Sequence, residues 1–235
     1  MRVYQATDIG HVRSTNEDAV LSFEPDTYLV ADGMGGHAAG EVASRILAET
    51  VRLTLSARSA PWREQELKDA MFRANEEILA RVKEQPQYRG MGTTATLLHF
   101  HEKTAYYAHV GDSRLYLMRG GSLQQVTRDH SYVEELVAQG SITREEAKRH
   151  PRRNLLTRAV GVQRELAVDT GNFAVEPGDR YLLCTDGLTN MVSDEEILAV
   201  LQTDEDPAES LLRKALDAGG TDNITILAVV YDNET

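Results

Sequence analysis

Aspartate ends an apolar, strand-like run at three places in the sequence and begins one at a fourth. The four sites are Tyr28–Ala31 before Asp32-Gly33, 181–185 before Asp186-Gly187, 108–111 before Asp112, and Asp222-Asn223 before Ile224. A single Asp-Gly pair is more typical of a tight turn than of a site. Four such aspartates, with Glu17 and Asp18 after the first strand-like run, favour a carboxylate cluster if the strand ends converge.

Carboxylates that converge in this way repel one another. At about 4 Å, each like-charged pair costs on the order of 4 kcal/mol at an effective dielectric near 20. Bound cations remove this cost. Oxygen ligands without a Cys/His set favour hard ions, so we expect two Mn²⁺ or Mg²⁺ ions and no structural zinc. Gly33 has no Cβ, which lets its backbone carbonyl approach a metal closely.

Arg13 supplies charge of the opposite sign, in the polar segment Arg13–Asp18. A guanidinium beside a metal site can hold a phosphate through paired hydrogen bonds. A lone arginine in a polar turn is more often a solvated surface residue. The phosphate-binding interpretation therefore depends on the aspartates lying close by.

Composition narrows the classes of function. Lys plus Arg total 25 and Asp plus Glu total 37, so the formal net charge is −12, which argues against a nucleic-acid binder. Cys184 is the one cysteine and cannot form an intrachain disulfide. No apolar run approaches the roughly 18 residues of a membrane span, and no signal segment follows Met1. We expect a cytoplasmic protein.

Strand-like runs come in consecutive groups and helical stripes come in pairs. The strand-like runs are 3–9, 19–23, 28–31, 94–100, 104–110, 115–118, 166–175, 180–185 and 224–231. Apolar spacings of three or four predict helices along Val42, Ile46, Thr50 and Leu53, along 67–82, and over 194–201 and 207–218. This order favours an α+β fold of antiparallel sheets covered by helices. No linker or repeat divides residues 1–235, so we expect one domain.

Seven ordered segments resemble the motifs of the PPM-type (protein phosphatase 2C-like) Ser/Thr phosphatases in their compact bacterial form. They are Arg13–Asp18, Val30–His37, Gly90–Thr94, Gly111–Arg114, Thr127–Ser131, Thr185–Gly187 and Thr221–Thr225. The resemblance covers nearly the whole chain. It implies a four-layer αββα sandwich with a metal site at one end, a mobile flap at about 131–161, and metal-dependent hydrolysis of phosphoserine and phosphothreonine in proteins.

The resemblance also implies roles for single residues of the metal site. Asp32 bridges two metals, and Gly33 offers its carbonyl. Asp186 and Asp222 bind the first metal, while Asp18 binds the second directly or through water.

Further roles follow from the same resemblance. Asp112 helps to bind a third, weaker metal, and Arg13 binds the phosphate. The remaining motif residues, Glu17, His37 and Asn223, are supporting residues. The hypothesis for the chemistry is direct attack on phosphorus by a hydroxide held between two metals, without a covalent intermediate.

One position departs from many eukaryotic members of the family. Met34 stands where they have a histidine that is a proposed general acid, and a thioether cannot donate a proton. A metal-bound water near Asp112 is the preferred donor to the leaving group. His37 is an alternative, although a histidine that opens a helix is more often structural.

A basic island lies in the flap of this acidic chain: Arg144, Lys148, Arg149, His150, Arg152 and Arg153. A solvated face explains such a run as well as a function does. The functional hypothesis is that Arg152 and Arg153 guide acidic phosphopeptides to the site. The expected partners are phosphorylated proteins, a Ser/Thr kinase and its targets, and we expect a monomer.

Two other functions compete with catalysis. Gly33–Ala38 fits a loose G-x-G-x-x-A dinucleotide pattern, but no acid-ended strand follows about 20 residues later. The stronger alternative is a catalytically silent metal-binding sensor or interaction domain of the same fold. Degenerate members usually lose metal aspartates, and all are present here, which favours the enzyme.

Overall fold

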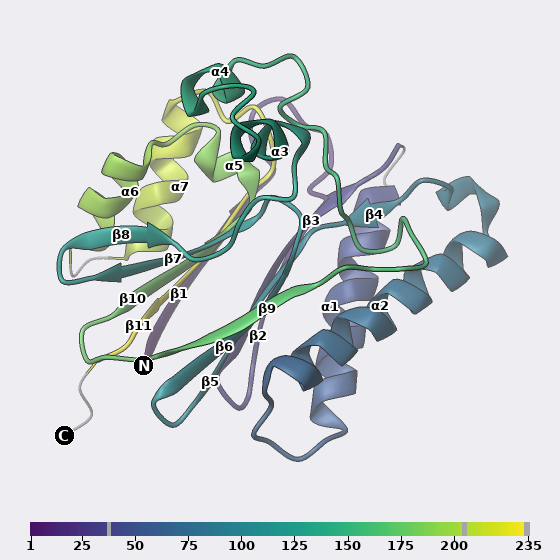
Figure 1. Ribbon diagram of the computed structural model, residues 1–235, viewed down its shortest axis with the longest axis horizontal. Helices are drawn as coiled ribbons and strands as arrows, with labels where there is room; N and C mark the ends of the chain where they lie inside the picture. Colours follow the sequence, from purple (N-terminus) through teal and green to yellow (C-terminus); the bar gives the residue numbers. More distant parts are fainter. Residues whose placement is uncertain (37–38, 204–205, 233–235) are drawn as a thin grey trace.

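The structure is a computed structural model that describes residues 1–36, 39–203 and 206–232. Two antiparallel sheets pack face to face, and a pair of helices covers the outer side of each (Figure 1). The order of layers is helix, sheet, sheet, helix. The predicted α+β sandwich is therefore confirmed.

The two sheets take their strands from both halves of the chain, and every pair is antiparallel. In strand order, the first sheet contains β1 (Arg2–Asp8), β11 (Ile224–Val230), β10 (Arg180–Cys184), β7 (Arg114–Arg119) and β8 (Ser122–Gln125). The second contains β2 (Asp18–Phe23), β3 (Thr27–Met34), β5 (Ala95–His101), β6 (Thr104–Val110) and β9 (Asp169–Ala174), with β4 (Gly92–Thr93) paired to β3.

Helices α1 (Ala39–Ser56) and α2 (Glu64–Glu84) pack on the second sheet, and α6 (Asp194–Leu201) and α7 (Pro207–Asp217) pack on the first. The shorter helices are η1 (Pro86–Tyr88), α3 (Tyr132–Ala138), α4 (Arg144–Lys148) and α5 (Asp186–Thr189). Among the described residues, no helix combines the length and the apolar character that a bilayer crossing requires.

The predicted helices are confirmed, but the predicted buried face of α1 is wrong by one position. Ala43, Leu47, Val51 and Leu55 are fully buried, whereas Leu53 is 52% exposed. Both sets have a spacing near four, so periodicity alone could not choose between adjacent faces. Packing against β3 decides it.

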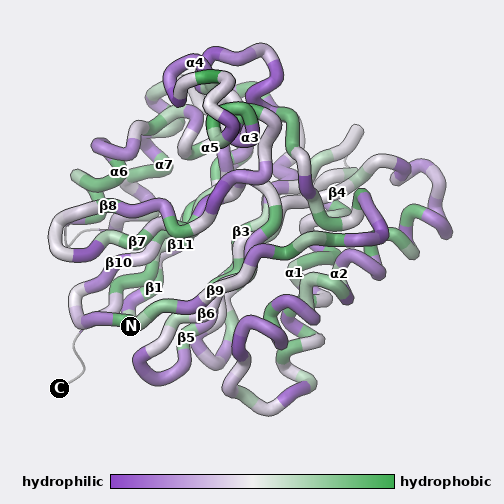
Figure 2. Tube along the Cα trace, viewed as in Figure 1, coloured by the Kyte–Doolittle hydropathy of each residue, from purple (hydrophilic) through white to green (hydrophobic). Residues whose placement is uncertain are grey.

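Three apolar clusters fill the three spaces between the layers. Strand β3 shows how one run serves two of them: Leu29 and Ala31 face the helices α1 and α2, while Tyr28 and Val30 face the other sheet. This is the alternation of a strand that is buried on both sides. Hydrophobic residues, green in Figure 2, also lie along the inner strands.

Strand register brings the aspartates to one end of the sandwich. Asp18 lies opposite Asp32 across the β2–β3 pair. In the other sheet, the N–H of Thr185, the residue before Asp186, donates to the carbonyl of Thr225 at 3.0 Å. The Thr185 hydroxyl crosses between the sheets and donates to Asp18 Oδ2 at 2.8 Å. Both sheets therefore end at the same place.

Two strands differ in length from the expected elements. Asp32-Gly33 lies inside β3, which continues to Met34, while Asp186 opens helix α5 directly after the predicted strand. The predicted strand 166–175 is shorter, because β9 begins at Asp169. The segment 131–161, called the flap from here on, contains α3 and α4 and projects at the top of Figure 1.

Candidate metal centre

Asp18 and Asp32 form the inner part of the carboxylate group. Asp18 Oδ2 accepts the hydrogen bond from Thr185, but Asp18 Oδ1 is buried and has no hydrogen-bond partner among the described residues. Burial raises the pKa of Asp18 to about 7. The Asp32 backbone N–H donates to the Thr94 hydroxyl at 2.8 Å, which fixes the strand at this carboxylate.

Asp186 and Asp112 come from the other side of the group. Asp186 is the first residue of α5, and its Oδ2 accepts a hydrogen bond from Asn190 Nδ2 at 3.0 Å. Its Oδ1 is buried without a partner in the described part of the chain. Asp112 lies in the turn between β6 and β7. Burial, and then the charge of Asp186, raises the pKa of Asp112 well above its usual range.

The electrostatics of Asp32 show that the group converges. Burial raises the pKa of Asp32 well above its ordinary value, and four negative charges add to this effect: those of Asp18, Asp186, Asp112 and Asp222, in decreasing order. The strand register agrees with this, because Asp18 lies opposite Asp32, and Thr185, the residue before Asp186, contacts the Asp18 carboxylate. That these carboxylates together hold metal ions stays a prediction.

Asp222 is engaged by the predicted phosphate-binding arginine. Arg13 Nη2 donates to Asp222 Oδ2 at 2.8 Å, and the two side chains are partly exposed. This hydrogen bond raises the pKa of Arg13. The structure therefore places the partly exposed guanidinium of Arg13 against the carboxylate of Asp222.

The backbone packs closely around Gly33. A Cβ at Gly33 would lie 2.1 Å from the carbonyl oxygen of Gly40 and 2.4 Å from that of Glu17. Only glycine fits between the start of α1 and the end of the 9–17 loop. The Glu17 carbonyl accepts hydrogen bonds from the Gly33 N–H at 3.1 Å and from the Ser44 hydroxyl at 2.6 Å.

Asn223 fastens the 9–17 loop to the start of β11. Its Oδ1 accepts from the Glu17 N–H at 2.8 Å, and its Nδ2 donates to the carbonyls of Ile9 and Thr15 at 2.9 and 3.0 Å. These bonds set the position of the loop that carries Arg13 and leads to Asp18, the first residue of β2. Burial raises the pKa of Glu17, whose side chain accepts a hydrogen bond from the backbone of Gly40.

The donor set fits hard divalent cations. It consists of carboxylate oxygens, two of which are buried and unpartnered, beside the tightly packed backbone of Gly33. The described residues contain no three His, Cys, Asp or Glu side chains already grouped as ligands of one ion. Asp222 accepts a hydrogen bond from Arg13.

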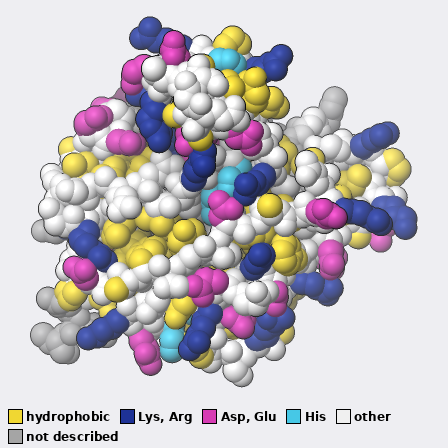
Figure 3. All heavy atoms as spheres, viewed as in Figure 1, with side chains coloured by type: hydrophobic (Ala, Val, Ile, Leu, Met, Phe, Trp, Pro, Cys, Tyr) yellow, Lys and Arg dark blue, Asp and Glu magenta, His cyan; other side chains and the backbone are white. Residues whose placement is uncertain are grey.

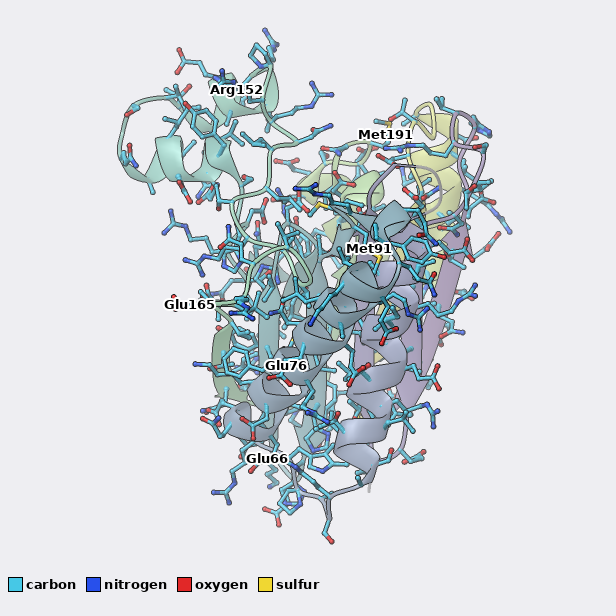
Figure 4. All side chains as sticks on the ribbon, turned by 90° about the vertical axis from the view of Figure 1, so that its right-hand side faces the viewer. Glu66, Glu76, Met91, Arg152, Glu165 and Met191 are labelled. Carbon is cyan, nitrogen blue, oxygen red and sulfur yellow. The ribbon has the colours of Figure 1, made fainter. Side chains whose placement is uncertain are left out.

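A cavity of about 560 Å³ opens beside the cluster and extends under the flap. Asp112 and Asp186 line its inner end, while Arg153 and Lys148 line its outer wall. Arg152 does not line the cavity among the described residues, because its guanidinium lies over the ring of Tyr132, 5.7 Å from the centroid. Figure 4 shows Arg152 on the outer part of the flap, away from the sheets. The candidate His37 lies outside the described residues.

Comparison with known proteins places this arrangement in a family. The sequence matches the family described as protein phosphatase 2C over residues 10–222. This chain belongs to the protein phosphatase 2C family.

Named members of the family are similar over nearly the whole of this chain. The chain is 41% identical to the serine/threonine phosphatase stp of Listeria monocytogenes over 237 residues, covering 96% of this chain and 94% of that one. It is 36% identical to the protein phosphatase PhpP of Streptococcus pneumoniae over 251 residues, covering 100% and 99%. The crystal structure of the PstP catalytic domain in complex with two manganese ions superimposes with a TM-score of 0.90 at 40% identity, covering 98% of each chain.

Four polar residues of this phosphatase 2C site were not singled out from the sequence. They are Thr94 and Thr185, whose hydroxyls contact the Asp32 N–H and the Asp18 carboxylate, and the ion pair of Arg114 with Asp129. The pair is bidentate, with Arg114 Nη2 to Asp129 Oδ2 at 2.7 Å, and it lines the cavity. Each lies in a recognised family motif, which was the available signal, but their partners are set by contacts between the sheets.

The raised carboxylate pKa values predict how divalent ions stabilise the protein. An acid whose pKa is higher in the folded protein than in the unfolded chain stabilises the metal-free fold when the pH is below its ordinary pKa. This stabilisation is lost as the pH rises. For Asp18 it is lost between pH 3.8 and about pH 7. Divalent ions need the deprotonated carboxylates. We therefore expect Mn²⁺, relative to chelator, to raise the Tm more at about pH 8 than at about pH 6.

Thermal scans with Mn²⁺ or EDTA at both pH values measure this effect. At a given pH the buried histidines affect the Tm equally in Mn²⁺ and in EDTA, so their effect cancels in the Tm difference between the two. Glu84→Gln removes an exposed carboxylate at the end of α2 and serves as the matched control, with an unchanged difference. An Mn²⁺ shift of equal size at both pH values would contradict a protonated carboxylate cluster.

The burial of Cys184 predicts that the protein does not use a cysteine nucleophile. The thiol is fully buried in β10, and burial raises its pKa to about 12, so it stays protonated and cannot act as a nucleophile. We expect Cys184→Ala to keep phosphatase activity within about twofold while losing roughly 1 kcal/mol of stability through the small cavity. Steady-state kinetics with a Tm measurement test this, and a folded but inactive variant would rule out the carboxylate mechanism.

Proposed function

We propose that this chain is a metal-dependent protein serine/threonine phosphatase that hydrolyses phosphoserine and phosphothreonine. The observation that carries the proposal is the group of five converging carboxylates with Arg13 at its mouth. A negatively charged group of this kind needs cations, and an adjacent guanidinium is suited to a dianionic ligand. The relatives stp and PstP are named serine/threonine phosphatases, and each matches nearly the whole of this chain.

In this proposal the carboxylates hold two Mn²⁺ or Mg²⁺ ions, with a weaker third. Asp32 takes the central position, because all four other carboxylates act on it. Asp186 and Asp222 approach it from one sheet and Asp18 from the other, while Gly33 offers a backbone carbonyl. Divalent ions at such a site supply a water of lowered pKa as nucleophile and Lewis-acid polarisation of the phosphoryl group.

Arg13 binds and orients the phosphoryl group. One Nη atom is bonded to Asp222, and a guanidinium carries five N–H donors, so further donors can meet phosphate oxygens. The Arg13 side chain is 49% exposed at the mouth of the site, within reach of a protein-bound phosphate. Negative charge that develops on the phosphoryl oxygens would be stabilised there without a covalent intermediate.

The cavity under the flap provides room for the residues beside the phosphorylated side chain. Its walls carry both signs of charge, with Lys148 and Arg153 on the flap and Asp194 and Glu195 at the start of α6. Figure 3 shows Lys and Arg side chains on the flap at the top of the molecule. Arg153 lines the cavity and Arg152 does not, so the guiding role belongs to Arg153 in this proposal.

The remaining parts of the proposal concern organisation and partners. Residues 1–235 form one catalytic domain, with the flap as its substrate-facing segment. Glu17 and Asn223 support the site through the bonds that hold the 9–17 loop. A partner Ser/Thr kinase, a monomeric state and a cytoplasmic location stay predictions.

The direct test is Mn²⁺-dependent hydrolysis of p-nitrophenyl phosphate and of a phosphothreonine peptide. We expect both activities to be abolished by chelator, and Asp32→Asn to lose roughly two orders of magnitude in kcat because the central ligand charge is gone. The metal-free variant should melt no lower than the metal-free parent, since a neutral amide avoids the cost of ionising a buried carboxyl beside other acids.

Two outcomes separate this proposal from its alternative. Absence of turnover with Mn²⁺, Mg²⁺ and other divalent ions, together with metal binding in calorimetry, would favour the silent sensor domain. Full activity of Asp32→Asn would show that the carboxylate group is not the catalytic centre.

Charge reversal on the flap tests the path of the substrate. We expect Arg153→Glu to raise KM for an acidic phosphopeptide about tenfold, because it inverts a charge in the cavity wall, and to leave p-nitrophenyl phosphate hydrolysis unchanged. The matched control is Arg152→Glu, one residue away but outside the cavity, which should change neither substrate. Equal effects of the two variants would indicate a general field effect and not a contact.

A further inference from the structure

His130 is a buried histidine at the base of the flap to which the proposed chemistry gives no role. It forms two hydrogen bonds with Gly111, the residue before Asp112. The backbone N–H of His130 donates to the Gly111 carbonyl at 2.7 Å, and the backbone N–H of Gly111 donates to the ring Nδ1 of His130 at 3.1 Å. The turn that presents Asp112 is therefore held by both the backbone and the ring of one residue.

Gly111 cannot easily be replaced at this turn. Its φ is +108°, and an added Cβ would lie 2.5 Å from Thr94 Cγ2. Glycine permits this backbone but does not itself favour one conformation over another. The pair of bonds from His130 supplies the restraint that glycine lacks.

The bond from Gly111 also fixes the tautomer of the His130 ring. A backbone N–H can only donate, so Nδ1 must be the unprotonated nitrogen. Nε2 then carries the proton and donates to Asp169 Oδ2 at 2.9 Å, while Asp169 Oδ1 accepts from Arg158 Nη1 at 2.8 Å. The ring is held from both sides, between the Asp112 turn and strand β9.

The two ends of the flap meet at the same residue. The Thr157 N–H donates to the His130 carbonyl at 2.9 Å, and the Tyr132 N–H donates to the Leu155 carbonyl at 2.8 Å. Next to His130, Ser131 forms an isolated bridge with 156 and accepts the N–H of Glu134 at the start of α3. His130 is thus the point at which the closed base of the flap touches the metal-site turn.

The ring of His130 also rests on β6. It lies 4.9 Å from the ring of His109, measured between centroids. His109 is fully buried, with its nitrogens 3.0 Å from the Thr96 hydroxyl and 3.1 Å from the Arg128 carbonyl. This support leaves the His130 ring little freedom to rotate.

We propose that His130 is a positioning residue that fixes the Gly111–Asp112 turn relative to the base of the flap, so that the seating of the flap and the position of Asp112 change together. This inference rests on the proposed function, in which Asp112 helps to hold the weakest metal. His130 does not touch substrate or metal in this scheme. It acts through the bond from Gly111 to Nδ1.

Two substitutions separate the bonds of the ring. In His130→Asn the side-chain oxygen can take the place of Nδ1 and accept the Gly111 N–H, but the contact with Asp169 is lost. In His130→Gln the longer side chain can reach Asp169 in place of Nε2, but Gly111 loses its acceptor. His101→Asn, at the far end of β5, is the surface control.

We expect His130→Asn to keep kcat within about twofold and His130→Gln to lose about tenfold in kcat, with KM nearly unchanged, for both p-nitrophenyl phosphate and a phosphopeptide. Calorimetric titration with Mn²⁺ should show the weakest binding step loosened about tenfold in the Gln variant only. Equal behaviour of the Asn and Gln variants, or a change confined to KM for the peptide, would overturn the proposal.

One measurement needs no variant and covers the case in which His130→Gln does not fold. Amide hydrogen exchange of the unmodified protein should show the Gly111 N–H protected as strongly as the N–H groups of β6. Exchange at the rate of an exposed loop would overturn the proposal. If the unmodified protein hydrolyses no phosphoester, the proposed function fails, while Gly111 protection and Mn²⁺ titration still decide the role of His130.

Discussion

Repulsion between buried carboxylates is the constraint on which this structure depends. Asp18, Asp32, Asp112 and Asp186 are held together by a fold that gains nothing from their charges, and burial raises the pKa of each. Two of their oxygens have no hydrogen-bond partner in the described part of the chain. A site of this kind is unfavourable until cations bind it, so binding strength and chemistry have the same origin.

The sandwich tolerates this repulsion because apolar packing away from the carboxylates stabilises the fold. Three apolar clusters fill the spaces between its four layers, and β3 serves two of them with alternate side chains. The carboxylates are confined to one end, where Asp18 and Asp32 pair across one sheet and Thr185 reaches over from the other. The apolar layers provide the rigidity, and the polar end provides the function.

The periphery of the site is organised by charge of the opposite sign and by neutral hydrogen bonds. Arg13 neutralises Asp222 at the mouth, the Arg114–Asp129 pair lines the cavity, and His130 joins the flap to the Asp112 turn. The flap contributes residues of both signs to the cavity lining, among them Lys148, Arg153 and Glu145, and the start of α6 contributes acids. Substrate would thus meet a site whose metal-binding and peptide-facing parts share one cavity.

The sequence by itself determined the fold class and the family, because strand alternation and the ordered motifs are local patterns, and it predicted which aspartates form the site. It could not decide which face of α1 is buried, since adjacent faces have the same period. Only the tertiary structure separated Arg153, in the cavity wall, from Arg152, stacked on Tyr132. Only it joined Arg13 to Asp222 and His130 to Gly111, because these contacts connect segments far apart in the chain and depend on register between strands and sheets.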